Sequence, residues 1–419
     1  MKLEIKNFGP IKEGKIETKK VTVLIGNQGS GKSTVAKLLA TFCSIEKDTF
    51  MQEKKFDNAY EIKKKFLNFL NYYCIDNYKK IDDDIYTNYI NSTDLHFRGS
   101  ICEFDAAYRY MSRDYDEDYV LNIDYIHDKY QLPRITYFPS ERNFVSSVKN
   151  SKDGLVYKLW LQSLQEFKEI FQEAKESLKN SLKLPINNTE VEYNNINGSL
   201  YVKGDNYKTP LSDSASGFQS FVPMFVVADY LSKLLKEGQE MNSRERERFK
   251  KESSYILNNP IFTDEQKSLL LSNLAGRINI KRTINIIEEP EQNLYPSSQR
   301  SMLNSLLGYN NEVDGNELIL TTHSPYILSY LMLAVKAAEL RDKANGNDEI
   351  LSKIYGIVPE KAITPIKDVV IYELNDDGTI SELKQVYGLP SNDNFLNNEL
   401  GEVNTLFSEL MEIEDLCHE

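Results

Sequence analysis

Cysteine, tryptophan and long apolar runs are all scarce in this sequence of 419 residues. The four cysteines lie far apart and form no CxxC pair, which argues against both a zinc site and a disulfide framework. We interpret them as reduced and without a role in function; they are Cys43, Cys74, Cys102 and Cys417. No apolar run approaches the length needed to span a bilayer, and the first ten residues alternate like a strand instead of resembling a signal peptide. The sequence therefore predicts a cytoplasmic protein with no membrane partner.

Basic residues are outnumbered by acidic ones. The chain has 50 Lys and Arg against 63 Asp and Glu, a formal net charge of −13. Such a charge repels a phosphate backbone on average, so broad nonspecific binding to nucleic acid is not expected. A local basic patch could still overcome the repulsion, which leaves nucleic-acid binding open.

Short apolar strands alternate with helical segments along much of the chain. Val21–Ile25 is almost entirely apolar, as expected of a strand covered on both faces, and from Val35 apolar residues recur at i, i+3, i+4 and i+7 of a helix. Two further apolar strands, Thr283–Ile287 and Glu317–Thr321, flank a helix that begins near Pro296. The pattern predicts an α/β fold with a mostly parallel core sheet, an N-terminal antiparallel β portion and helical insertions.

The same pattern divides the chain into one interrupted head and its insertions. The motifs described below extend from the first thirty residues to beyond residue 320, so they must belong to one domain. A polar, Tyr-rich interval is predicted to be an inserted helical subdomain, a second polar interval a helical insertion, and the last segment an acidic tail. The predicted segments are 1–44, 133–236 and 282–385 for the head, 45–132 and 237–281 for the insertions, and 386–419 for the tail.

A glycine-rich loop lies between the first buried strand and its helix, and it fits the pattern GxxxxGK[ST] in the required context. In such a loop the glycines let backbone N–H groups surround the β-phosphate, Lys32 bridges β- and γ-phosphate oxygens, and the Ser33 hydroxyl binds Mg²⁺. The sequence therefore predicts a site for ATP and Mg²⁺, formed by Gly26, Asn27, Gln28, Gly29, Ser30, Gly31, Lys32, Ser33 and Thr34.

Two adjacent carboxylates, Glu288 and Glu289, end the apolar strand Thr283–Ile287. Ligands of open α/β sheets bind at this end of the strands. Phosphoryl transfer needs one acid for the metal shell and one to orient or deprotonate water. An acid pair in isolation is more often a solvated turn, but its place after such a strand favours function. We predict that Glu288 binds Mg²⁺ and that Glu289 acts on the attacking water.

Two more polar groups follow buried strands. His323 comes after Glu317–Thr321 and can donate a hydrogen bond to a γ-phosphate oxygen or steady the water. A lone histidine is usually structural, so this prediction rests on its position. Arg142 follows another apolar strand in the sequence Pro139-Ser140-Glu141-Arg142, where it either contacts the nucleotide or pairs with Glu141.

A loop rich in Ser and Gly, Leu211–Ser220, opens a predicted helix between the P-loop and the acid pair. The N-terminus of such a helix is a second anion cradle, and its small side chains permit close approach. A flexible linker has the same composition, so the position of the loop between the two motifs decides in favour of binding.

Together these motifs resemble the ABC/SMC-type ATPase superfamily, in the branch that includes SMC-like heads and the OLD (overcoming lysogenization defect) nucleases. The likeness implies an ABC-type P-loop ATPase head in which Lys32, Glu289 and His323 are catalytic. The corresponding parts are Walker A at Gly26–Thr34, the signature loop at Leu211–Ser220, Walker B at Ile286–Glu289, the D-loop at Glu291–Leu294 and the switch histidine at His323.

The resemblance further implies that Ser214, Ser216 and Gly217 of one copy contact ATP bound to another. Two heads would then enclose two ATP molecules in a homodimer, or in a higher oligomer built from it. Glu288 stands where the superfamily usually has aspartate, as is common in the OLD-like branch. OLD nucleases continue into a Toprim domain, whereas only 96 residues (419 minus 323) follow His323. The chain thus resembles the ATPase subunit of two-gene anti-phage systems such as PARIS, and a separate effector protein, a nuclease or toxin, is expected.

Two other functions remain open. One is a nucleotide-dependent scaffold that barely hydrolyses ATP, which predicts oligomers whose stability depends on occupancy of the site and not on turnover. The other is an SMC-like DNA-repair ATPase, although the acidic charge and the lack of sustained heptads count against it.

Overall fold

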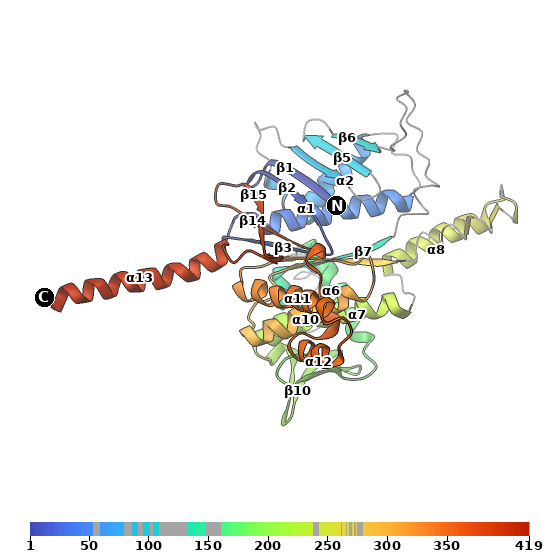
Figure 1. Ribbon diagram of the computed structural model, residues 1–419. Helices are drawn as coiled ribbons and strands as arrows, with labels where there is room; N and C mark the ends of the chain where they lie inside the picture. The colour runs from blue at the N-terminus through green and yellow to red at the C-terminus, as the bar shows by residue number, and fades with distance from the viewer. Residues whose placement is uncertain are drawn as a thin grey trace.

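A computed structural model shows the arrangement of most of the chain. The residues that the structure describes are 1–52, 59–78, 86–90, 95–100, 104–108, 132–147, 161–237, 243–260, 262–264, 266–267, 270–271, 274 and 280–418. A central sheet separates an upper layer, which contains the N-terminal strands and α1, from a lower layer of helices (Figure 1).

The central sheet has six strands in the order β15-β14-β3-β13-β12-β7. Every neighbouring pair is parallel except β14 with β15. The loops that follow β3, β7, β12 and β13 therefore lie along one edge of the sheet. The predicted α/β fold with a mostly parallel core sheet is confirmed. The strands are β3 (Val21–Gly26), β7 (Pro133–Phe138), β12 (Arg282–Glu288), β13 (Glu317–Thr321), β14 (Val369–Leu374) and β15 (Ile380–Glu382).

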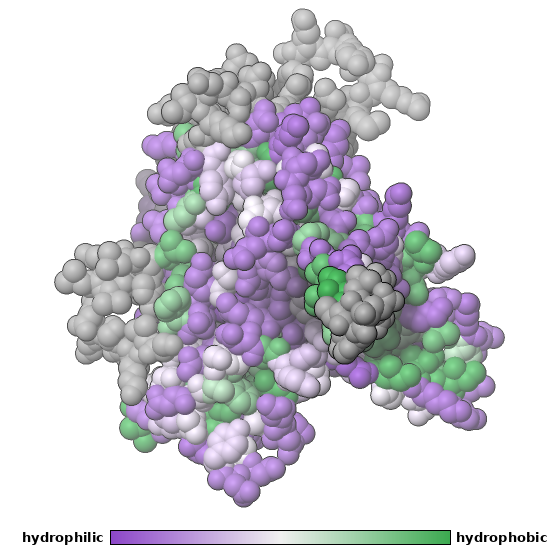
Figure 2. All heavy atoms as spheres, turned by 90° about the vertical axis from the view of Figure 1, so that its left-hand side faces the viewer, coloured by the Kyte–Doolittle hydropathy of each residue, from purple (hydrophilic) through white to green (hydrophobic). Residues whose placement is uncertain are grey.

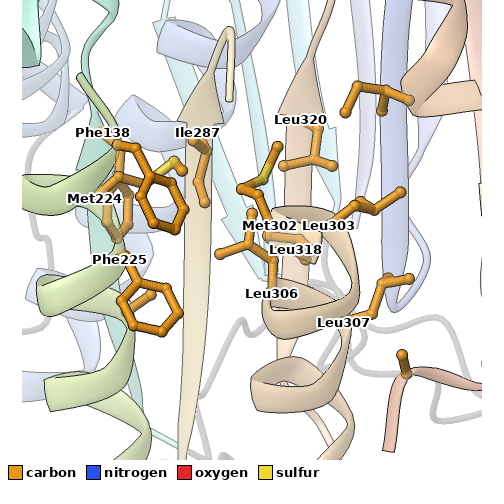
Figure 3. Close-up of a cluster of buried hydrophobic side chains, with 14 of the residues drawn as sticks. Phe138, Met224, Phe225, Ile287, Met302, Leu303, Leu306, Leu307, Leu318 and Leu320 are labelled. Carbon is orange, nitrogen blue, oxygen red and sulfur yellow. The ribbon is translucent and has the colours of Figure 1, made fainter. Parts of the chain in front are cut away.

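The central strands are buried on both faces, and their side chains alternate between two separate cores. Ile287 and Leu320 face the lower core, where they meet apolar residues of α7 and α10 (Figure 3). Ile286 and Ile319 face the upper core with α1. The helices are α1 (Lys32–Gln52) above, and α6 (Gln162–Glu176), α7 (Ser216–Glu237), α10 (Pro296–Asn311) and α11 (Pro325–Ala344) below. Helices α1 and α7 therefore pack on opposite faces of the sheet.

The N-terminal antiparallel portion is larger than the sequence predicts. It is a five-stranded sheet in the order β2-β1-β4-β5-β6. The interval 45–132, expected to be helical, contains α2 (Ala59–Tyr72) but also three of these strands. Aromatic and β-branched residues in Tyr86–Ile90 favour a strand, and pairing with β1 gives its backbone groups partners. The rest of this interval lies largely outside the described residues. The strands are β1 (Lys2–Phe8), β2 (Ile11–Glu17), β4 (Tyr86–Ile90), β5 (Leu95–Ser100) and β6 (Phe104–Tyr108).

Smaller elements complete the fold. An antiparallel sheet has the order β11-β10-β9-β8. Its strands are β8 (Leu182–Lys183), β9 (Glu190–Asn194), β10 (Ser199–Gly204) and β11 (Tyr207–Pro210). Further short elements are α4 (Phe144–Ser147), α12 (Asp348–Ile357), β16 (Gln385–Val386) and β17 (Leu389–Pro390). Cys43 and Cys74 are free cysteines, and Cys102 lies outside the described residues.

Two helices extend away from the body on opposite sides, α8 (Ser243–Asn258) and α13 (Phe395–His418) (Figure 1). The face from which α13 extends is largely hydrophilic (Figure 2). Helix α13 nevertheless exposes several apolar side chains: Leu406, Phe407, Leu410, Met411 and Ile413. Among the described residues, no helix combines the length and the apolar character required to cross a bilayer.

Candidate active site

The glycine-rich loop joins β3 to the start of α1 at Lys32. Gly26, Gly29 and Gly31 have φ values of 145°, 81° and 104°, which L side chains rarely adopt. A Cβ atom at Gly26 would also lie 2.5 Å from the carbonyl oxygen of Leu374 in the neighbouring strand. The loop can therefore take this shape only with glycine at these positions, and its N–H groups continue into the unpaired N–H groups that begin a helix.

Lys32 is buried and bends back over this loop. Its Nζ donates hydrogen bonds to the carbonyl oxygens of Gly26, at 2.9 Å, and Asn27, at 2.7 Å. Burial lowers the pKa of Lys32 to about 8, while the carboxylates in Glu288–Glu291 act in the opposite direction. The side chain thus holds a cation beside the phosphate-binding loop, with acceptors that phosphate oxygens can replace.

Glu288 ends β12 and is buried among polar groups from the neighbouring strand. Its Oε2 accepts a hydrogen bond from the backbone N–H of Ser140, at 3.3 Å, while its Oε1 is buried and has no hydrogen-bond partner. Burial raises the pKa of Tyr137 well above its usual value, and the charge of Glu288 raises it further. A buried carboxylate oxygen without a partner suits a divalent cation, so this residue fits the predicted Mg²⁺ role.

The metal site would need ligands beyond the protein. Within the described part of the chain, no group of three or more His, Cys, Asp or Glu side chains could hold a metal ion. Mg²⁺ is usually bound by one or two protein groups together with phosphate oxygens and waters. Glu288 and the exposed Ser33 at the start of α1 are consistent with that pattern.

Glu289 occupies a strained backbone turn directly after β12. Its φ is 44°, in the left-handed region, and its N–H donates to the carbonyl oxygen of Thr321 at 3.0 Å. Burial raises the pKa of its carboxyl group, and the neighbouring Glu288 adds to this rise. A carboxylate with a raised pKa is a better proton acceptor near neutral pH.

His323 lies against the same turn. Its Nε2 is 3.8 Å from Oε1 of Glu289, and its backbone N–H donates to Oε1 of Glu291 at 2.8 Å. Burial lowers the pKa of His323, and the positive charge of Lys32 lowers it further. The structure therefore brings together the four predicted groups that follow β3, β12 and β13: the P-loop, Glu288, Glu289 and His323.

The signature loop lies elsewhere in the fold. It leads into α7, which packs on the face of the sheet opposite α1. Ser214 is half-buried and donates to the carbonyl oxygen of Pro210 at 2.9 Å, whereas Ser216 is exposed. A Cβ atom at Gly217 would lie 2.8 Å from the carbonyl oxygen of Asn293 in the D-loop. The loop thus packs closely on the D-loop of its own chain and leaves the side chain of Ser216 accessible.

Arg142 has a role that sequence reasoning missed. In place of either expected contact, with a nucleotide or with Glu141, the structure shows a fully buried side chain that donates to backbone carbonyl oxygens. The sequence feature that could have indicated proximity to the site is the position of Arg142 just after β7, at the same edge of the sheet as the other site residues.

The fold and the site define a P-loop ATPase domain of the α/β class. The chain matches the family described as AAA ATPase domain over residues 1–328, which is most of its length. It therefore belongs to that family. A comparison with curated proteins finds no match.

Solved structures give distant likenesses. The SMC head domain from Thermotoga maritima has 12% identity and a TM-score of 0.30, covering 78% of this chain and 90% of that one. An SMC head bound to the C-terminal winged-helix domain of ScpA has 11% identity and a TM-score of 0.34, covering 92% and 98%. A dimeric ATP-binding cassette bound to ADP and Pi has 10% identity and a TM-score of 0.29, covering 92% and 100%. These TM-scores are low, so the fold assignment rests on the strand order and the family match.

Proposed function

We propose that this chain binds ATP with Mg²⁺ and hydrolyses the ATP in an assembly in which two copies enclose each nucleotide. The observation that carries this proposal is the convergence of Lys32, the acid pair and His323 at one edge of the parallel sheet. The carboxylates of Glu288–Glu291 raise the pKa of Lys32 against the effect of its burial. Nε2 of His323 lies 3.8 Å from Oε1 of Glu289.

Each residue then has a definite task. Lys32 exchanges its two backbone acceptors for phosphate oxygens of ATP, beside the N–H groups of the P-loop. Ser33 and Glu288 would hold Mg²⁺, which neutralises charge on the phosphates when bound. Glu289 orients a water molecule and takes its proton as the water oxygen bonds to the γ-phosphorus. The bond from the γ-phosphorus to the bridging oxygen breaks, and ADP and phosphate are released.

His323 supports this step as a neutral hydrogen-bond donor. Its lowered pKa favours the uncharged imidazole, which can donate one hydrogen bond to the water or to a γ-phosphate oxygen without adding a charge beside Lys32. The hydrogen bond from its backbone N–H to Glu291 fixes the start of the loop that carries it.

A second copy would complete the site through its signature loop. Two observations support this proposal. Helix α7 packs on the face of the sheet opposite α1, and it begins at the exposed Ser216, where its N–H groups can bind an anion. Ser214, Ser216 and Gly217 of one copy would then contact the triphosphate held by Lys32 of the other. A homodimer with two enclosed nucleotides follows, or a larger oligomer built from such dimers.

The ATP-bound state would control a separate effector protein, a nuclease or toxin, in anti-phage defence. This part is supported by the resemblance of the motifs to ATPase subunits of two-gene defence systems. Expression of the chain together with its neighbouring gene should lower phage plaque counts, and Lys32→Ala should abolish that protection. Equal protection with and without Lys32 would refute control by ATP.

Turnover of ATP by purified protein tests the enzymatic part. Glu289→Gln removes the proton acceptor and keeps the size of the side chain, so turnover should fall about 100- to 10,000-fold while ATP still binds. Lys32→Ala should weaken ATP binding itself, because a charged partner of the phosphates is lost. Equal turnover in the wild type and both variants would reject hydrolysis at this site.

A further inference from the structure

Arg142 is a buried cation whose hydrogen bonds go to the backbone. Its Nε donates to the carbonyl oxygen of Ser220 at 3.1 Å, and its Nη2 donates to that of Glu289 at 2.6 Å. Its Nη1 is shared between the carbonyl oxygens of Glu288, at 2.6 Å, and Pro139, at 3.2 Å. One side chain thus joins three separate segments of the chain.

The guanidinium remains charged despite its burial. Burial lowers the pKa of Arg142 to about 10, and the carboxylates of Glu291, Glu289 and Glu288 act in the opposite direction. Burying a charge costs free energy, so this arrangement is a poor way to stabilise a core, although it fixes the carbonyl groups that it contacts. Two of those carbonyl groups belong to the acid pair.

The strained turn at Glu289 is held from both sides by these contacts. Thr321 accepts from its backbone N–H, and Arg142 donates to its carbonyl oxygen. Because the left-handed conformation of a glutamate is unfavourable, it persists only where its surroundings hold it. Arg142 is therefore one of the groups that determine where the Glu289 carboxylate points.

The third segment held by Arg142 is the first part of α7. Ser220 lies four residues after Ser216, where α7 begins. The same turn is tied by two further hydrogen bonds, from Ser146 Oγ to the carbonyl oxygen of Gln219 at 2.8 Å and from Asn293 Nδ2 to Ser220 Oγ at 3.0 Å. A small displacement of the start of α7 must therefore be transmitted to Arg142 or to the D-loop.

We propose that Arg142 is a positioning residue that couples α7, the signature helix, to the catalytic glutamate, Glu289. When the signature loop of α7 engages the nucleotide of a second copy, Arg142 carries that displacement to the carbonyl oxygen of Glu289 and positions its carboxylate to take the proton of the attacking water. This inference rests on the proposed function, since it assigns a cause to the activity of the composite site.

Arg142→Lys tests the coupling with the charge retained. A single ammonium group cannot reproduce the fork that contacts Ser220, Glu288 and Glu289 together. At saturating ATP, kcat should fall about 100-fold, the loss expected from misplacing a catalytic group by about 1 Å. KM should stay within about threefold, because the P-loop is unchanged.

Arg134→Lys provides the matched control. Arg134 is another buried arginine of the same segment, on β7, and its partner is Glu173 of α6, at 3.8 Å. Its replacement should affect thermal stability but leave kcat near the wild-type value. Equal losses of kcat in both variants would mean that Arg142 acts only through stability, and a normal kcat for Arg142→Lys would overturn the coupling.

Amide hydrogen exchange gives a readout that does not depend on turnover. In the wild type, ATP should protect both residues 216–222 and residues 286–293; in Arg142→Lys the first segment should still gain protection while the second does not. Joint protection in both proteins would overturn the coupling even if kcat were reduced. A wild-type protein that shows joint protection but no ATP turnover would reject the proposed hydrolysis and leave the mechanical coupling supported.

Discussion

Two regions differ in how completely one copy of the chain assembles them. One is the P-loop corner, formed by the P-loop, Glu288, Glu289 and His323, and the other is the signature loop. At the P-loop corner, groups from the ends of β3, β12 and β13 meet within one chain, and Lys32, Glu288 and Glu291 are held by contacts with neighbouring residues. The signature loop starts a helix on the other face of the sheet and exposes Ser216. In the composite site that we propose, binding would be a property of one copy, whereas turnover would require the surface of another.

Arg142 is the structural link between these two regions. It contacts the carbonyl oxygens of the acid pair and that of Ser220 in the signature helix. The two regions are therefore separate as surfaces but joined through backbone contacts in the interior. Changes made at either region should therefore have different consequences.

A negative charge at the signature loop should separate turnover from binding. In Ser216→Glu the new carboxylate would face the triphosphate of the second copy, and like charges about 4 Å apart repel by about 4 kcal/mol at an effective dielectric constant of about 20, or roughly a thousandfold. ATP-dependent assembly and turnover should both be lost, as measured by light scattering and phosphate release. ATP affinity of the separate copies should stay within about twofold.

Ser216→Gln is the control for this change, since it adds the same bulk without charge. The fold should tolerate the glutamate, because an acidic residue at the start of a helix interacts favourably with its dipole. Retention of ATP-dependent assembly by Ser216→Glu would show that the loop does not face a triphosphate.

Raising the pH should weaken binding at the P-loop corner alone. The pKa of Lys32 is about 8 without nucleotide, and the negative triphosphate should raise it. Below pH 8 the lysine is already charged and affinity is highest. Above pH 8 binding must add a proton, so affinity should fall by up to about tenfold per pH unit until the pKa of the bound state is reached.

Titration calorimetry at pH 7, 8 and 9 measures this effect. Proton uptake should appear above pH 8 as a dependence of the binding enthalpy on the buffer, and Lys32→Met should lose it. An affinity that stays constant from pH 7 to 9 would contradict a depressed pKa at this position.

The sequence predicts the P-loop corner well because each of its parts follows a buried strand. In a parallel sheet, all such positions lie at one edge, so the sequence alone predicts that Lys32, Glu288 and His323 lie close together. The fold class follows from the same alternation of strands and helices. Local patterns are sufficient where strand direction alone determines proximity.

Contacts made by the backbone could not be predicted in this way. Arg142 contacts the carbonyl groups of Ser220 and Glu288, which lie 78 and 146 positions away from it in the sequence. No pattern of side chains reveals such contacts. Strand β4 was not predicted because its partner β1 is distant in sequence, and β5 and β6 extend the sheet from β4. The left-handed turn at Glu289 likewise depends on Thr321 and Arg142 and not on its own residue type.

The molar mass of Glu289→Gln with and without ATP tests the central claim most directly. The chain has a mass of 48.4 kDa. If two copies enclose the nucleotide, saturating ATP with Mg²⁺ should at least double the mass measured by light scattering, and ADP should not. One bound ATP per chain with no change in mass would contradict the account.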